Sequence, residues 1–438
     1  MNSVLADAAS PTPASNEDAW KNLPKSEHGQ GTLLPTWARQ LAPQLPKSTA
    51  ALLQLDYAHR EASPLPVKLR AAMRYVAAHA NSSPYAQSVA LEDLKRRGIG
   101  EDLIAGLNAS DYSQWSPSEQ AALEFARKMT VASETVTDEE FARLVADFGD
   151  KHAACMVLLM AYSNFQDRLL ISLQTVFNPE IDSVPAPRIQ FPPSGLLPAA
   201  PPSPAPPPAK KPLPQPAGQD LVPDDPDWTA VSYDDLQVRL DNQRQRQTRL
   251  PIPEWSVIAK NLQPGLFRGP SDIVWYRIVF GYAPELATPY EIFMRTAGAE
   301  TSPDYDRIFG QSLFWITTRA IGCPYCMGHC EMNWEVAGLS HEEIAQRSRI
   351  LSSNDWSSFP ESEQLAFAFA RKLTKSPGSI ASADLDGLRH AFGDRKALIV
   401  MLHAGRHHYM TRISNGFQLT LERENVFYDY WNVKRPSK

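Results

Sequence analysis

Four cysteines in a chain of 438 residues are too few to hold a fold together by disulfides. No apolar run approaches the roughly 18–20 residues that a membrane-spanning helix needs. A net charge of −6 also lacks the positive excess that is typical of nucleic-acid-binding proteins. We therefore expect neither a membrane partner nor a nucleic-acid partner. Because the cysteines do not form a disulfide framework, we expect a reducing, cytoplasmic location.

The sequence also lacks the alternation of apolar and polar residues that indicates a half-buried β-strand. Between residues 33 and 180, apolar side chains recur at helical spacing, and Leu69 and Met73 fall on one helix face. Ser116 and Glu119 have the spacing of a capping box, just before an apolar helical pattern. The sequence therefore predicts an all-α protein, and its length favours more than one domain.

Proline is abundant but unevenly spread, since residues 184–226 contain 16 of the chain's 38 prolines. Such a stretch cannot form a hydrogen-bonded ladder, so we predict a semi-rigid linker there. A ligand for a proline-reading module is the less favoured alternative. The polar stretch rich in alanine, serine and proline at residues 1–30 predicts a disordered leader.

The second half of the chain repeats the first. Residues 81–86 align with residues 321–326 at an offset of 240. The sequence Phe-Ala-Arg-Lys at residues 125–128 recurs at residues 369–372, at an offset of 244. Self-similarity at a nearly fixed spacing indicates that one helical unit is present twice.

We therefore predict two tandem helical domains, at residues 31–183 and 227–438, packed together as a pseudo-dimer. The first copy has Ser83 and Ala86 where the second copy has cysteines. We expect the first domain to be catalytically silent and the second to be active.

Three of the four cysteines lie in one short stretch, as Cys323, Cys326 and Cys330. Pro324 favours the first turn of a helix, which would make Cys323 the N-cap and Cys326 the third helical residue. Unpaired backbone N–H groups and the helix dipole favour a thiolate there, so we expect a lowered pKa for Cys326. His329 and Cys330 follow at i+3 and i+4, on the same helix face. The pattern is typical of a redox site.

Three other interpretations of this stretch stay open. Cys-Pro-Tyr-Cys is also the glutaredoxin active-site sequence, which would need strand–helix–strand surroundings. A metal site would combine the cysteines and His329 with a second segment, for which His403, His407 and His408 are candidates. The cysteines could also be small buried apolar residues, with the histidines only decorating a helix. We favour a redox disulfide, with no metal and no cofactor.

A helical unit with a CxxC at a helix start resembles the carboxymuconolactone decarboxylase superfamily, on its alkylhydroperoxidase D-like branch. Ser340 and Glu343 resemble the capped helix start that follows the CxxC helix in that family. The resemblance covers residues 260–422 and, more weakly, residues 35–175. It implies two alkylhydroperoxidase D-like domains, of which the first is degenerate.

The resemblance also implies roles for the site residues. Cys326 would attack a peroxide and become a sulfenic acid, which Cys323 would resolve as a Cys323–Cys326 disulfide. Two positions depart from the family, since Cys330 stands where it has a histidine and Gln311 where it has a glutamate. Gln311 cannot take a proton, so we expect His329 to serve as the base. Cys330 is expected to remain a thiol.

We therefore predict an enzyme, a thiol-dependent oxidoreductase that reduces peroxides or disulfides. Its substrate would be a small peroxide or disulfide, and its electrons would come from a thiol protein or a small thiol. Lactone decarboxylation, the other chemistry of the superfamily, does not need a CxxC. A non-catalytic assembly or metal-binding module is the remaining alternative, and homo-oligomer formation is left open. Supporting roles are assigned to Cys330, Gln311, His403 and His407.

Overall fold

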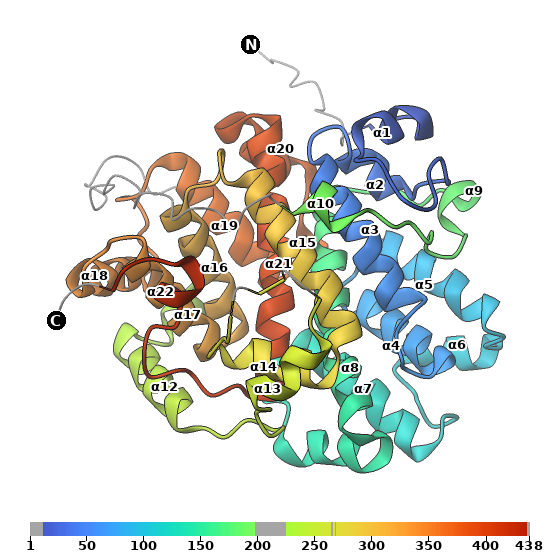
Figure 1. Ribbon diagram of the computed structural model, residues 1–438, viewed down its shortest axis with the longest axis horizontal. Coiled ribbons are helices and arrows are strands. Elements are labelled where there is room, and N and C mark those ends of the chain that lie inside the picture. Colours follow the sequence, from blue (N-terminus) through green and yellow to red (C-terminus); the bar gives the residue numbers. More distant parts are fainter. Residues whose placement is uncertain (1–11, 198–224, 264–265, 268, 436–438) are drawn as a thin grey trace.

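The computed structural model describes residues 12–197, 225–263, 266–267 and 269–435, and its regular secondary structure there is helical (Figure 1). In these ranges no strand forms, and the one β-type contact is an isolated antiparallel bridge between His28 and Gln190. The predicted all-α class is therefore confirmed. A glutaredoxin-like fold is excluded for the dithiol region, because that fold requires a β-sheet around the motif.

The helices of the N-terminal half are α1 (Asn16–Asn22), α2 (Thr36–Leu41), α3 (Pro46–Arg60), α4 (Val67–Ala80), α5 (Pro84–Arg96), α6 (Glu101–Ala109), α7 (Pro117–Val131), α8 (Asp138–Ser172), α9 (Pro179–Asp182) and α10 (Pro193–Leu196). Those of the C-terminal half are α11 (Pro226–Thr229), α12 (Tyr233–Gln245), α13 (Trp255–Ile258), α14 (Val274–Tyr282), α15 (Pro284–Thr301), α16 (Arg307–Ile321), α17 (Pro324–Val336), α18 (His341–Ser352), α19 (Glu361–Lys375), α20 (Ser382–Phe392), α21 (Asp394–Phe417) and α22 (Phe427–Trp431). Short 3-10 helices lie at η1 (Ser133–Thr135), η2 (Ala259–Asn261) and η3 (Pro377–Ser379).

The helix starts repeat at the spacing found in the sequence. Helices α4, α5 and α6 begin 240 residues before α16, α17 and α18, and α7 and α8 begin 244 residues before α19 and α20. Both halves also share a kink, since Gly149 interrupts α8 with φ 80° and ψ 161°, and Gly393 separates α20 from α21 with φ 74° and ψ 161°. Glycine adopts this region without the strain that other residues suffer. These matches support one helical unit used twice, while the limits 31–183 and 227–438 stay predictions.

Helices α8 and α21, which occupy equivalent places in the two repeats, pack along each other and join the two halves (Figure 1). A Cβ at Gly405 of α21 would lie 3.4 Å from the Phe165 carbonyl oxygen and from the Leu169 nitrogen, both on α8. A Cβ would therefore make ordinary van der Waals contacts there, but a longer side chain would meet the backbone of α8. Helices α3 and α15 form a second contact between the halves.

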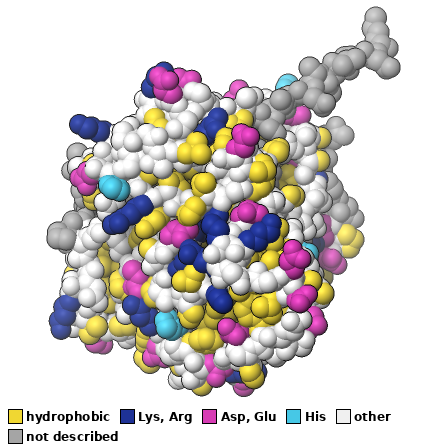
Figure 2. Space-filling view, turned by 90° about the vertical axis from the view of Figure 1, so that its right-hand side faces the viewer, with side chains coloured by type: hydrophobic (Ala, Val, Ile, Leu, Met, Phe, Trp, Pro, Cys, Tyr) yellow, Lys and Arg dark blue, Asp and Glu magenta, His cyan; other side chains and the backbone are white. Residues whose placement is uncertain are grey.

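Charge is mixed on the face shown in Figure 2, where acidic and basic side chains are interspersed with apolar ones. This face therefore carries no large field of one sign. Among the described residues, no helix has the length and apolar character that crossing a membrane requires.

The prediction of a disordered leader is wrong for the part of it that the structure describes. Residues 16–22 form α1, which is capped by the Ser15 side chain. Trp20 is buried, and its indole N–H donates to the Thr32 carbonyl oxygen at 2.8 Å. A large aromatic side chain thus anchors a stretch whose composition is otherwise polar. Residues 1–11 lie outside the described residues.

The prediction of a linker is wrong at its beginning. Ile189, Phe191 and Leu196 are buried in the core, and α10 packs on α3. These apolar side chains fix the chain to the N-terminal half despite its prolines. The remainder of the predicted linker, residues 198–224, lies outside the described residues.

Candidate functional site

The dithiol motif lies at the junction of α16 and α17, with the local structure that the sequence predicts. Gly322 ends α16 with φ 74°, a left-handed conformation that suits glycine. Cys323 is the N-cap of α17 and Pro324 is its first residue. The backbone N–H of Cys326 donates to the Cys323 sulfur at 3.4 Å. Both cysteines therefore belong to a helix N-terminus, where unpaired N–H groups favour negative charge.

Cys326 is only 2% exposed, and its sulfur lies 3.1 Å from the Ser414 hydroxyl of α21. Burial raises the pKa of the Cys326 thiol well above its usual value, and Cys323 adds to the rise, whereas the Ser414 contact lowers it. The lowered pKa expected from the sequence is therefore wrong for this closed arrangement. Lost hydration outweighs the helix N-terminus. Thiolate formation requires water or substrate to reach the sulfur.

All four cysteines are buried free thiols. Burial raises the pKa of Cys330 well above its usual value, and the charges of Glu331 and Cys323 act in the same direction. Burial also raises the pKa of Cys155, on α8 in the first repeat, to about 12. The structure thus presents the dithiol in its reduced form, and the Cys323–Cys326 disulfide stays a prediction.

His329 is held by a carboxylate that the sequence did not single out. Its Nε2 lies 2.7 Å from Glu422, and its ring contacts Tyr325 and Phe427. The Tyr325 hydroxyl and the Val274 backbone N–H donate to the other Glu422 oxygen, at 2.9 and 2.7 Å. Burial alone would raise the pKa of Glu422, but His329 and the backbone N–H of Val274 bring it below its usual value. In the described structure His329 makes no hydrogen bond to a cysteine.

The first repeat has a structural counterpart of Glu422. Asp182 accepts a hydrogen bond from Tyr85, just as Glu422 accepts one from Tyr325. A tyrosine at the second position of α5 and α17 is thus anchored by a carboxylate in both halves. The offset of 244 that holds in this part of the repeat would pair Asp182 with Val426, so the sequence register does not reveal Glu422.

The other predicted site residues make no hydrogen bond to the sulfurs of Cys323 and Cys326 in the described structure. Gln311 is half-buried on α16 and makes no hydrogen bond within the described residues. His403 lies 2.9 Å from the Thr301 hydroxyl, and His408 lies 3.2 Å from the Thr374 hydroxyl, both through Nε2.

His407 is buried against Phe314, with ring centroids 4.4 Å apart. Burial lowers the pKa of His403, His407 and His408 well below the usual value, so these imidazoles are neutral. Over the described ranges, no group of three or more histidine, cysteine or acidic side chains has the arrangement that a metal ion needs.

The first repeat holds a cavity of about 20 Å³ at the place that corresponds to the dithiol. Ala86 and Ala90, the counterparts of Cys326 and Cys330 at the offset of 240, line this cavity. Its volume suits about one water molecule. The small side chains therefore leave a void where the second repeat has thiols.

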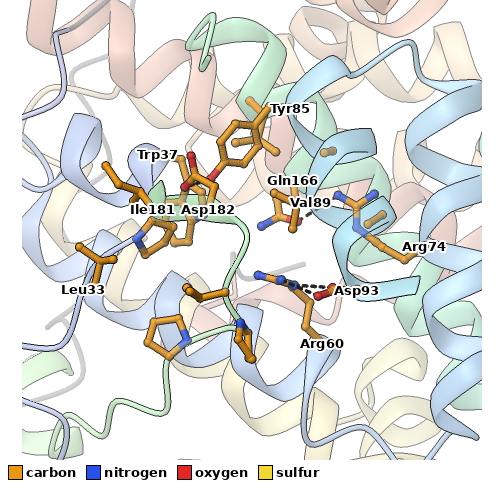
Figure 3. Close-up of a pocket in the computed structure, with 17 residues that line it drawn as sticks. Leu33, Trp37, Arg60, Arg74, Tyr85, Val89, Asp93, Gln166, Ile181 and Asp182 are labelled. Carbon is orange, nitrogen blue, oxygen red and sulfur yellow. Dashed lines mark hydrogen bonds and ion pairs between the residues drawn. The ribbon is translucent and has the colours of Figure 1, made fainter. Parts of the chain in front are cut away.

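Buried ion pairs surround this cavity (Figure 3). Arg60 donates through Nε and Nη2 to the two oxygens of Asp93, each at 3.0 Å. Arg74 donates to Asp167 of α8 at 2.5 Å. The first repeat thus has paired charges at the place where the second has thiols, and its predicted catalytic silence stays a prediction.

The first repeat also packs against Gly322, the residue just before the dithiol. A Cβ at Gly322 would lie 3.3 Å from Cγ of Glu134, a residue of η1. The equivalent contact on the other side joins Gly378 to Ser82, so the carboxylate is present only at the cysteine-bearing site. Arg412 of α21 spans the same boundary, donating to the carbonyl oxygens of residues 129 and 130 at 3.0 and 2.9 Å. The dithiol is therefore built against the first repeat.

Comparison with known proteins adds no family to this geometry: no protein-family model matches the chain, and no curated protein is a significant match.

Proposed function

We propose that the protein is a thiol-dependent oxidoreductase of the alkylhydroperoxidase D-like kind, which reduces hydroperoxides or disulfides through Cys326 and Cys323. One observation carries the proposal: the Cys323 sulfur accepts the Cys326 amide at the N-terminus of α17, while Ser414 contacts the Cys326 sulfur. Two thiols share a helix start, and Cys323 is the N-cap, whose backbone is not helical.

With a hydroperoxide, the Cys326 sulfur attacks the terminal oxygen and the O–O bond breaks. Cys326 becomes a sulfenic acid, and its thiol proton goes to the departing alkoxide, which leaves as an alcohol. The Cys323 sulfur then displaces hydroxide from Cys326, the Cys323 proton completes a water molecule, and the disulfide forms. An external dithiol or two thiols reduce the disulfide and are themselves oxidised.

With a disulfide substrate, Cys326 forms a mixed disulfide and releases one thiol, and Cys323 then releases the second. In this proposal Glu422 orients His329 by contacting its ring nitrogen Nε2. Because this nitrogen is occupied, His329 influences the thiols electrostatically rather than by taking a proton. Cys330 remains a thiol because it follows Cys326 at i+4 within a regular helix, where the Cβ directions of such a pair are nearly parallel.

The test is mass spectrometry of the reduced protein after one equivalent of hydrogen peroxide. We expect a Cys323–Cys326 disulfide, with Cys155 and Cys330 still reduced thiols. In Cys323→Ser, a sulfenic acid or over-oxidised form should persist on Cys326. Recovery of all four cysteines unmodified, or oxidation of the four at equal rates, would contradict the proposal.

A second candidate function, non-catalytic assembly, is favoured by one observation: every cysteine is buried. In that case the thiols would only fill the core, and the peroxide experiment would leave them unchanged. A thiol electron donor, a cytoplasmic setting and a homo-oligomeric state are parts of the redox proposal that need separate measurement.

A further inference from the structure

A group of polar side chains lies between α15, α16 and α21 without the partners that buried polar atoms normally have. The hydroxyls of Tyr290 and Tyr305 and the Nδ1 atom of His407 are buried and make no hydrogen bond in the described structure. Buried polar atoms are nearly always satisfied by protein or by water, so each exception requires an explanation. Three such atoms lie close together here, where the oxygens of a polar ligand would complete their hydrogen bonds.

Arg406 of α21 supplies a positive charge to this group. It is half-buried, its Nε donates to Nδ1 of His403 at 3.3 Å, and no carboxylate of the described residues lies within ion-pair distance. The nearby Arg295 differs, because Glu291 lies 2.5 Å from it. A half-buried guanidinium without a counter-ion can bind an anion strongly, because its N–H groups donate to the oxygens of the anion.

The surrounding histidines carry no negative charge that could neutralise Arg406. His403 accepts a hydrogen bond at Nδ1, so its proton is on Nε2 and is donated to the Thr301 hydroxyl. The Tyr305 ring stacks on His403 with centroids 4.2 Å apart, which brings its hydroxyl into the same region. The Tyr290 hydroxyl lies beside Arg406 without a hydrogen bond of good geometry. The available groups are therefore mainly donors, and they match the oxygens of a carboxylate.

The group adjoins the dithiol. His403, His407 and Ser414 follow one another at spacings of four and seven residues, so they share one face of α21. Ser414 on that face contacts Cys326. Negative charge on Cys326 would raise the pKa of Tyr290, and charge on Cys330 would raise that of Tyr305, so each tyrosine lies within electrostatic reach of a thiol.

We propose that Arg406, together with the hydroxyls of Tyr290 and Tyr305, binds a carboxylate of the substrate. The inference rests on the proposed thiol chemistry and narrows its substrate class to hydroperoxides or disulfides that carry a carboxylate. Binding the carboxylate on α21 would direct the rest of the substrate along the helix face toward Cys326.

Isothermal titration calorimetry of the reduced full-length protein tests the inference without turnover. Sodium acetate and sodium hexanoate are the probes, and methyl acetate and methyl hexanoate are their uncharged counterparts. We expect at least one carboxylate to bind about tenfold more tightly than its ester. Arg406→Gln should remove this preference, and Arg406→Lys should retain part of it, because the charge remains while the planar fork is lost.

Arg127→Gln is the matched control, since it makes the same change at an exposed arginine of α7, and it should bind as the native protein does. Equal binding of acid and ester, no binding of either carboxylate, or unchanged binding by Arg406→Gln would each overturn the inference. If Arg406→Gln does not fold, Arg406→Lys provides the test, because its preference for the carboxylate over the ester should be smaller than that of the native protein. Hydrogen peroxide carries no carboxylate, so failure of Cys326 to react with it would refute the thiol chemistry separately.

Discussion

The Ser414 hydroxyl oxygen lies 3.1 Å from the Cys326 sulfur, across the contact between α21 and α17. The same hydroxyl donates to the Met410 carbonyl oxygen at 2.8 Å, so in the thiol state the Cys326 S–H is the donor to Ser414. When Cys326 loses its proton, Ser414 must turn its O–H toward the sulfur. Within the described ranges, Ser414 is therefore the one group from another helix that hydrogen-bonds directly to the proposed nucleophile.

Ser414→Ala is expected to raise the pKa of Cys326 further and to slow its oxidation by hydrogen peroxide about fivefold. The reason is loss of one hydrogen bond to the thiolate, worth about 1 kcal/mol. Stopped-flow measurement of the oxidation rate against pH gives both quantities.

Ser163→Ala is the control for this substitution, because Ser163 on α8 is also fully buried and donates to its own helix, at the Leu159 carbonyl. It should leave the rate unchanged within about twofold. Equal slowing in the two variants would assign the effect to helix stability rather than to the thiol.

The sequence alone could predict features that depend on neighbouring residues, but not those that depend on residues far apart in the chain. The start of α17 was predictable, because Pro324 and the N-cap role of Cys323 are local preferences. Ser414 and Glu422 were missed, since each lies about 90 residues from the motif and is brought there only by packing. The pKa of Cys326 was predicted in the wrong direction for a related reason: the helix N-terminus is visible in the sequence, whereas the depth of burial is not.

The same distinction explains the errors in the predicted leader and the predicted linker. Composition described the leader and the linker correctly as polar or proline-rich. A few apolar anchors, Trp20 and Phe191 among them, find sites in the core, and composition averages do not resolve single anchors.

Glu422→Gln is expected to destabilise the protein by about 1–3 kcal/mol at pH 7, because a buried charged hydrogen-bond network loses its charge. The folded-state pKa of Glu422 lies below its usual value, so its stabilising contribution is full above about pH 4.3 and is lost as pH falls through the folded value. Urea unfolding of both proteins at pH 7 and over the range below about pH 4.3 measures the difference. The gap should narrow in acid.

Glu424→Gln, at an exposed position two residues on, should change stability by less than about 0.5 kcal/mol at either pH. A gap between native protein and Glu422→Gln that stays constant with pH would show that Glu422 is not ionised in the fold.

Arg74→Met is expected to cost about 3–5 kcal/mol, because it leaves Asp167 as a buried charge without its cation. The double variant Arg74→Met/Asp167→Leu should recover most of that loss, since no charge then remains buried. Denaturant unfolding of the single and double variants measures the coupling. Lys21→Met, which breaks an exposed pair with Glu17, should cost no more than about 1 kcal/mol. A double variant as unstable as the sum of its parts would contradict the ion-pair account.

The close approach of α8 and α21 gives the last prediction, which compares two helical glycines. Alanine is favoured over glycine within a helix by roughly 0.5–1 kcal/mol, because it loses less backbone entropy on folding. At Gly387 of α20 an added Cβ would meet nothing within 4 Å, so Gly387→Ala should stabilise the protein by about that amount. At Gly405 the new Cβ would lie 3.4 Å from two backbone atoms of α8, an ordinary van der Waals distance that leaves little room for a longer side chain.

Gly405→Ala should therefore keep most of the helix gain, whereas Gly405→Leu should separate the two helices at a cost of about 1–3 kcal/mol or more. Thermal and urea unfolding of the three variants provide the comparison. Because α21 also carries Ser414, Gly405→Leu should slow Cys326 oxidation as well, whereas Gly387→Ala should not. If Gly405→Leu is as stable as Gly405→Ala, the two helices are not in the close contact described, and the dithiol is not held in place through that interface.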